Sequence, residues 1–192
     1  MRAALRCVGS LAVVALCGAG AASAQRPQTR EGFWIAFGFG YGSAKPSCDL
    51  CGSLDSRGGA TGFLKLGGTL TKQVLLGGEI NAWTKSENGV TDQLGNVSAA
   101  LYYYPAVASG FFLKGGVGFS SFRETDGFTD DGTGFGLLGG VGYDIRVGRN
   151  VSLTPVANFY WGGVGDIKES GTTVATGWKQ HVFDVGLGVT FH

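Results

Sequence analysis

The chain has 192 residues and a near-balanced charge, with 15 basic and 14 acidic residues, so it is long enough for one domain and gives no reason to expect nucleic acid as a partner. The 36 glycines follow no G-X-Y repeat, which excludes a collagen-like fold. After the first 24 residues, no segment approaches the ~20 uninterrupted apolar residues of a membrane-spanning helix. If this chain crosses a membrane, its strands must do so.

Residues 1–24 have the pattern of a cleaved secretory signal. Two arginines provide a positive start, an apolar stretch follows, and Ala-Ser-Ala at 22–24 is a small-residue cleavage site. Cleavage leaves 168 of the 192 residues. We expect the mature chain to begin with a short periplasmic segment at 25–30, followed by one domain over 31–192.

The mature chain keeps two cysteines, Cys48 and Cys51. Because an exported protein meets an oxidising compartment, we expect a disulfide between them, within a loop. A zinc site would need two further ligands, and neither His181 nor His192 is near in the sequence. Free thiols and a metal site remain the alternatives.

Eight segments of the mature chain alternate between an apolar face and a small or polar face, as strands do. They cover residues 31–42, 59–70, 74–84, 94–104, 110–122, 134–146, 151–161 and 183–192. Their lengths are close to the ~9–11 residues that cross a bilayer at a tilt. Pro155 costs the seventh strand a ladder hydrogen bond, unless it lies at a bulge or an irregular pairing.

The connections between these segments alternate between long and short. Long loops are expected at 43–58, 85–92, 123–133 and 162–177. Outer-membrane barrels show this asymmetry, with short periplasmic turns and longer external loops. The pattern predicts an all-β fold, an eight-stranded antiparallel up-and-down transmembrane β-barrel with both chain ends on the periplasmic side.

Charged residues decide which face of each strand points outward. Six of them fall within the expected strands, all on the face opposite the apolar one: Lys65, Glu79, Lys114, Asp144, Arg146 and Asp184. A soluble barrel would need an exterior dense in charge. A lipid-facing surface must carry none, since Lys or Arg at the bilayer midplane costs ~2–4 kcal/mol. We therefore expect the apolar face to contact lipid, with aromatic residues gathered in belts at the two interfaces.

The chain resembles the small eight-stranded outer-membrane barrel proteins, the OmpA-, OmpX- and OmpW-like group. Besides the export signal, the resemblance depends on the final strand, whose apolar residues alternate with small or polar ones: Phe183, Val185, Leu187, Val189 and Phe191. In that family the barrel-assembly machinery recognises a terminal aromatic residue. Phe191 would be this signal, although His192 follows it. The resemblance implies a location in the cell outer membrane, among lipid and lipopolysaccharide; we expect a monomer without cofactor or metal.

Two pairs of charges are candidates for a site in the lumen. Lys65 and Glu79 are equally far from the turn at Lys72, so a hairpin places them opposite one another on the same face. Lys114 and Asp144 would pair if the register of their hairpin allowed it. With Asp184, we expect these groups to form ion pairs that close a lumen already about filled by side chains. The alternative is a constriction in a passive channel for small hydrophobic solutes.

The other motifs give only weak support for nucleotide binding, lipid hydrolysis or calcium binding. Residues 134–139 match the dinucleotide fingerprint by letter but lie inside an expected strand with no helix after it. A lipid hydrolase would need the fold to bring His181 and Asp184 within hydrogen-bond reach of Ser43 or Ser170. The acidic loop at 124–131 lacks calcium-loop spacing. Because this fold hosts many activities, we expect a non-catalytic structural or surface-interaction protein, with the channel as first alternative and a lipid-modifying enzyme as second.

Overall fold

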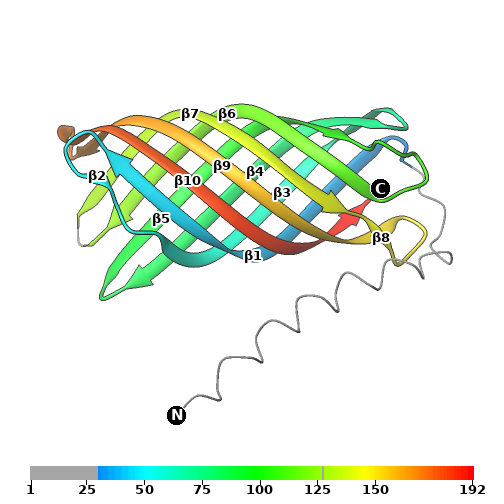
Figure 1. Cartoon of the computed structure of the whole chain (residues 1–192), viewed down its shortest axis with the longest axis horizontal. Helices are drawn as coiled ribbons and strands as arrows, with labels where there is room; N and C mark the ends of the chain where they lie inside the picture. Colours follow the sequence, from blue (N-terminus) through cyan, green and yellow to red (C-terminus); the bar gives the residue numbers. More distant parts are fainter. Residues whose placement is uncertain (1–29, 127) are drawn as a thin grey trace, which may run out of the picture.

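A computed structural model describes residues 30–126 and 128–192, which form an elongated barrel of strands (Figure 1). The expected signal at 1–24 and residues 25–29 lie outside these ranges. Within the ranges, no helix is long and apolar enough to span a membrane. The strands are β1 (Phe33–Cys48), β2 (Gly52–Ser53), β3 (Arg57–Thr71), β4 (Val74–Glu87), β5 (Val90–Tyr103), β6 (Phe111–Thr125), β7 (Thr129–Tyr143), β8 (Ile145–Arg146), β9 (Val151–Glu169) and β10 (Thr172–Phe191).

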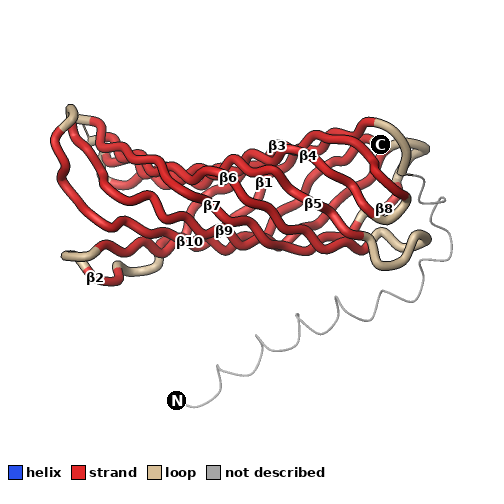
Figure 2. Tube along the Cα trace, turned by 90° about the horizontal axis from the view of Figure 1, so that it is seen from above, coloured by secondary structure: helices blue, strands red, loops and turns tan. Residues whose placement is uncertain are grey.

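The eight long strands close on themselves. Each pairs antiparallel with the long strands before and after it, and β1 pairs with both β3 and β10. The closing ladder runs from Ile35 opposite Phe191 to Ser47 opposite Lys179, so the wall has no open sheet edge there. Figure 2 shows the strands wound obliquely around one long axis. The predicted eight-stranded antiparallel up-and-down barrel is confirmed.

The two faces of the wall carry opposite chemistry, as predicted. Phe37, Leu66 and Leu187 lie on the outer surface, with 46%, 44% and 51% of their area exposed, whereas Lys65 and Asp184 are each 3% exposed. The six charged strand residues are between 0% and 6% exposed, all of them inside the barrel. An apolar exterior around an enclosed polar interior is the arrangement of a transmembrane barrel.

Outward aromatic residues mark the two membrane interfaces. On four strands they recur eight positions apart: Phe33 and Tyr41, Phe111 and Phe119, Phe135 and Tyr143, Phe183 and Phe191. At ~3.3 Å per residue and a tilt of ~40°, eight residues rise roughly 20 Å, near the height of a barrel's apolar band. Strand residues beyond the upper belt, such as Glu124 at the end of β6, therefore stand outside the membrane.

The external connections differ from the prediction, because the strands extend through most of the expected loops. β4 and β5 leave only Asn88–Gly89 between them, and β9 and β10 leave only Ser170–Gly171. The φ angles are +52° and +87° in the first turn and +49° and +88° in the second. Two successive positive φ angles belong to type I′ turns, whose twist matches that of paired strands. Each ladder can therefore continue to its tip.

The predicted strand at 134–146 is interrupted at Asp144, which lies between the end of β7 at Tyr143 and the start of β8 at Ile145. The Asp144 N–H donates instead to the carbonyl of Gly110 at 2.9 Å. Pro155 on β9 lies opposite this break, between Val156, paired with β7, and Leu153, paired with β8. An irregular pairing is the expected place for a residue that lacks an N–H.

Candidate functional site

An ionic cluster occupies the lumen. Lys65 on β3 lies opposite Glu79 on β4, with Lys65 Nζ 3.9 Å from Glu79 Oε1. Lys114 reaches the same Oε1 from β6 with a short hydrogen bond, and the Tyr102 hydroxyl donates to Glu79 Oε2 at 2.5 Å. Glu79 is fully enclosed, at 0% exposure. The buried Glu79 carboxylate therefore pairs with two buried lysines, and each of its oxygens accepts a hydrogen bond.

The hypothesised pairing of Lys114 with Asp144 is wrong. The β6–β7 register places Lys114 opposite Gly140, four positions before Asp144, and Lys114 extends to Glu79 instead. Asp144 accepts hydrogen bonds from the hydroxyls of Tyr104 and Thr154, both at 2.8 Å. Because residues 123–133 were expected to form a loop, sequence spacing alone could not give the register of this hairpin, whose strands continue to Thr125 and Thr129.

Arg30, just before β1, enters the short-turn end of the barrel. It is 2% exposed, and its guanidinium carbon lies 3.6 Å from the centre of the Tyr104 ring. Its terminal nitrogens donate to the carbonyls of Val107 at 3.1 Å and Ser109 at 2.6 Å. This part of the expected periplasmic segment thus helps to cover the lower opening of the lumen.

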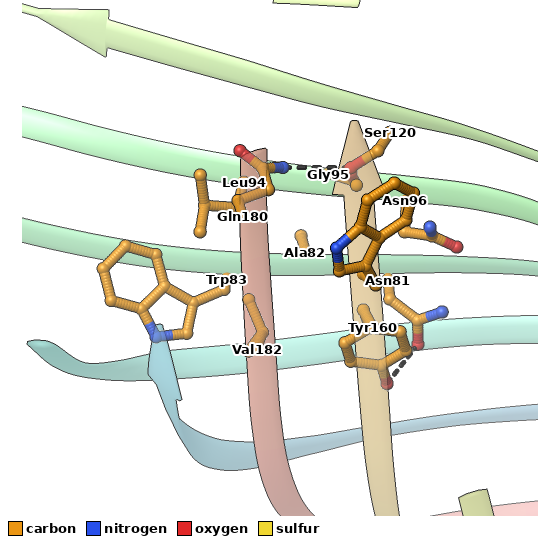
Figure 3. A pocket seen from close by; sticks show the side chains of 12 residues that line it. Asn81, Ala82, Trp83, Leu94, Gly95, Asn96, Ser120, Tyr160, Gln180 and Val182 are labelled. Carbon is orange, nitrogen blue, oxygen red and sulfur yellow. Dashed lines mark hydrogen bonds between the residues drawn. The ribbon is translucent and has the colours of Figure 1, made fainter. Parts of the chain in front are cut away.

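Amide and hydroxyl groups from different strands also meet inside the barrel (Figure 3). The Tyr160 hydroxyl donates to Asn81 Oδ1 at 2.9 Å, and Gln180 Nε2 donates to Ser120 Oγ at 3.0 Å. Asp184, expected in an ion pair, accepts instead from Asn158 Nδ2 at 2.7 Å. Its carboxylate is satisfied by a neutral donor from the neighbouring strand β9.

The spaces left inside the barrel are small. One, beside Lys65, Tyr102 and Asp144, has a volume of about 20 Å³, and another, beside Asn81 and Tyr160, about 10 Å³. A single water needs ~10–15 Å³ on this measure. These two spaces therefore have room for about one water each and do not form a path for a solute.

A larger cavity of about 340 Å³ opens at the external end, above the filled lumen. We call it the outer vestibule. Trp83, Phe122 and Trp178 line it with aromatic rings, and Asp92 and Glu124 with carboxylates. The sequence did not predict this site, because residues 85–92 and 123–133 were expected to form loops. The Asn88–Gly89 dipeptide was the signal for a tight turn between longer strands.

Cys48 and Cys51 form a disulfide at the end of β1. β2 then pairs back onto β1, with Ser53 opposite Ser47. The Asp49 N–H donates to the carbonyl of Thr176 on β10 at 3.2 Å. This connection is thereby held against the barrel, and its residues Leu54 and Asp55 form part of the vestibule wall.

No triad for acyl transfer is formed among the hydrolase candidates in the described residues. His181 and Asp184 are three positions apart on one strand, so their side chains point to opposite faces; His181 stacks outside on Phe159, with ring centres 6.3 Å apart. Ser170 is at a hairpin tip, and Ser43 Oγ lies 2.5 Å from Ser56 Oγ.

One Ser, His and Asp do meet at the short-turn end. His192 Nε2 lies 3.1 Å from Ser152 Oγ and 3.9 Å from Asp144 Oδ2. A triad needs the serine at one ring nitrogen and the aspartate at the other, whereas here both face Nε2. Ser152 is also 0% exposed, so no substrate reaches it.

In the described residues, the remaining motifs form neither a dinucleotide site nor a metal site. Residues 134–139, which match the dinucleotide fingerprint, lie within β7 and so lack the helix N-terminus on which a pyrophosphate would bind. Within 30–126 and 128–192, no group of three or more His, Cys, Asp or Glu residues is arranged to hold a metal ion.

His192 gives a pH prediction. Burial lowers its pKa to about 4, although the nearby Asp144 carboxylate opposes this shift. Because the folded-state pKa is below the ordinary 6.5, the stabilisation is complete above pH 6.5 and is lost as the pH falls toward 4. We expect the wild type to lose on the order of 3 kcal/mol over this range relative to His192→Gln, measured by urea unfolding in non-ionic micelles. Parallel pH curves for the two proteins would contradict this.

A model of the "outer membrane protein beta-barrel domain" family matches residues 11–191. The chain belongs to this family. Its location is therefore the outer membrane of a Gram-negative cell. No curated protein sequence matches the chain.

The structure is similar to two solved barrels, from Neisseria and Yersinia pestis. Neisserial surface protein A is 18% identical with a TM-score of 0.54, over 85% of this chain and 98% of that one. Ail, the attachment invasion locus protein of Yersinia pestis, was solved with the heparin analogue sucrose octasulfate. It is 14% identical with a TM-score of 0.58, over 84% of this chain and 99% of that one. At these identities, the likeness shows a shared fold.

Proposed function

We propose that this outer-membrane barrel is a closed, non-catalytic protein that presents its external hairpins and vestibule to partners at the cell surface. The observation that carries this proposal is the filled lumen. Glu79, Lys65 and Lys114 meet in its interior, each 6% exposed or less. The neighbouring spaces have volumes of about 10 and 20 Å³.

A hydrophobic solute would have to displace this cluster to pass. Separating Glu79 from its two lysines would leave buried charges unpaired, which costs several kcal/mol. Two barrels of the same shape are named as a surface protein and an attachment protein, and we extend a role of this kind to the present chain. Phe191, the outward aromatic of the last strand, is in this proposal the assembly signal.

The test is solute flux through the folded barrel. In planar bilayers, we expect no discrete conductance steps, and in liposomes no uptake of a small hydrophobic solute above that of protein-free vesicles. Uptake that depends on folded protein would support the channel instead. As a control, a larger open porin in the same vesicles must show flux. Incubation with lipopolysaccharide should leave the lipid mass unchanged; a mass change would establish an enzyme.

A further inference from the structure

The outer vestibule holds more negative charge than its neighbours neutralise. Among the described residues that line it, Asp55, Asp92 and Glu124 are acidic and Arg57 is basic. Arg57 forms a close ion pair with Asp92 Oδ2. Glu124 and Asp55 have no such partner among the ion pairs of the vestibule wall. The vestibule is therefore net acidic when its carboxyl groups are ionised.

The sheet register places further carboxylates beside those of the vestibule. Asp92 on β5 lies directly opposite Glu124 on β6, Glu124 opposite Asp130 on β7, and Asp130 opposite Glu169 on β9. Four neighbouring strands thus place carboxylates in one row across the inner wall of the external end. Like charges directly opposite one another destabilise a sheet, so a cation bound along this row would relieve a repulsion present in the free protein.

One buried carboxylate oxygen in the vestibule has a donor only while its neighbour is protonated. Asp92 is 7% exposed, and its Oδ2 bonds Arg57. Glu124 shares a side-chain hydrogen bond with Asp92 when it is protonated; once Glu124 is ionised, Asp92 Oδ1 has no donor among the described residues. Leaving such an oxygen buried and unbonded costs ~1–3 kcal/mol or more for a charged group. Asp92 is thus a preformed acceptor on the vestibule wall.

The floor of the vestibule is aromatic and rigid. The rings of Phe122 and Trp178 pack with their centres 4.4 Å apart. The indole N–H groups are already used: Trp83 donates to the carbonyl of Gly42 and Trp178 to Gln180 Oε1, both at 3.1 Å. The rings therefore offer apolar surface to a ligand, and their faces attract organic cations more than anions.

From these features, we propose that the outer vestibule binds a small organic cation that carries a flat apolar group, of the arylalkylammonium class. The ammonium group lies against Asp92 and Glu124, and the ring packs on Trp83, Phe122 and Trp178. A cavity of about 340 Å³ is within the ~300–1,000 Å³ range of small-molecule sites. The inference rests on the proposed function, because above a conducting lumen the vestibule would be a channel mouth.

Binding should strengthen as the pH rises. Partial burial raises the pKa of Glu124 to about 7, followed by a hydrogen bond to Asp92 that favours the protonated form and by the neighbouring carboxylates of Asp92, Asp130 and Asp126. The other charged groups that line the vestibule are Asp55 and Arg57, of which Arg57 stays cationic throughout. Glu124 is thus largely protonated at pH 5.5 and ionised at pH 8.5, where it attracts the cation.

The experiment is calorimetric titration of the full folded barrel, in non-ionic micelles, with benzylammonium chloride, whose N–H groups can donate to Asp92. We expect saturable binding that is at least tenfold tighter than that of methylammonium, which lacks the ring, and no binding of benzenesulfonate, which reverses the charge. Asp92→Asn and Glu124→Gln should each raise the Kd about tenfold, and Glu124→Gln should remove the pH dependence. Glu87→Gln, at the β4–β5 tip, is the matched control and should bind as the wild type does.

Equal binding of the anion, or unchanged affinity in both vestibule variants, would overturn the inference. Heat-modifiable gel migration shows that each variant is folded, and Glu124→Gln keeps the shape of a half-buried side chain outside the membrane, so misfolding does not explain its result. Uptake of the probe by proteoliposomes separates the two proposals. Absence of both binding and uptake overturns the site alone, whereas binding with uptake overturns the closed lumen alone.

Discussion

Replacing Glu79 with glutamine is expected to lower the free energy of unfolding by about 3–5 kcal/mol, the cost of removing one partner from a buried ion pair. Glutamine keeps the shape but leaves Lys65 and Lys114 without an anion, in a lumen where both are nearly inaccessible to water. Urea unfolding in lipid vesicles, followed by gel migration with and without heating, measures the loss. Solute permeability should stay at the wild-type level.

Two further variants isolate the cause of this effect. Glu87→Gln removes a carboxylate from the exposed pair with Lys85, whose charged atoms lie 2.9 Å apart, and should change stability little. Replacing Lys65, Glu79 and Lys114 together with methionine removes all three charges and should recover most of the loss. If the triple variant is less stable than Glu79→Gln, the unpaired charge is not the cause.

The second large effect is expected from Gly118→Ala on β6. A Cβ atom at this inward position would lie 2.0 Å from the carbonyl oxygen of Val97 on β5 and 2.7 Å from Ser98 Cα. Both are backbone atoms, so the two strands would have to separate. Overpacking typically costs ~1–3 kcal/mol, occasionally more, and we expect the upper end of this range, together with slower assembly into vesicles.

A matched control comes from the outward face. At Gly78 on β4, an added Cβ would meet nothing within 4 Å. Gly78→Ala should therefore be neutral or slightly stabilising, since glycine in a strand interior weakens it. Similar stabilities for Gly118→Ala and Gly78→Ala would show that close approach of the strands does not require glycine at 118.

Much of the barrel follows from period-two alternation. The outward positions of Phe37 and Leu187 and the inward position of Asp184 were fixed once each strand had one apolar face. Lys65 and Glu79 could be set opposite one another because a short turn separates their strands. Lys114 and Asp144 could not be placed in this way, because residues 123–133 were expected to form a loop and so gave no register. In the structure these strands pair as far as Thr125 and Thr129, which sets Lys114 opposite Gly140.

The vestibule could not be derived in the same way. Its residues come from β1, β3, β4, β5, β6, β10 and the connection after β1, so their meeting depends on barrel closure and on strands longer than the membrane requires. The parts of these strands that extend beyond the membrane have no apolar face. Their sequence pattern therefore predicted loops. The row from Asp92 to Glu169 becomes visible only when those strand extensions are in register.

The long β9–β10 hairpin determines how far the protein reaches from the cell. Thr172 is eleven positions beyond the belt residue Phe183, which at ~3.3 Å per residue and ~40° of tilt raises the tip roughly 28 Å. A headgroup layer is only ~5–8 Å deep on each side. An antibody can therefore bind the tip without contacting the lipid headgroups. Because exposed tips accept insertions, a peptide epitope placed between Ser170 and Gly171 would be displayed on a stiff stalk.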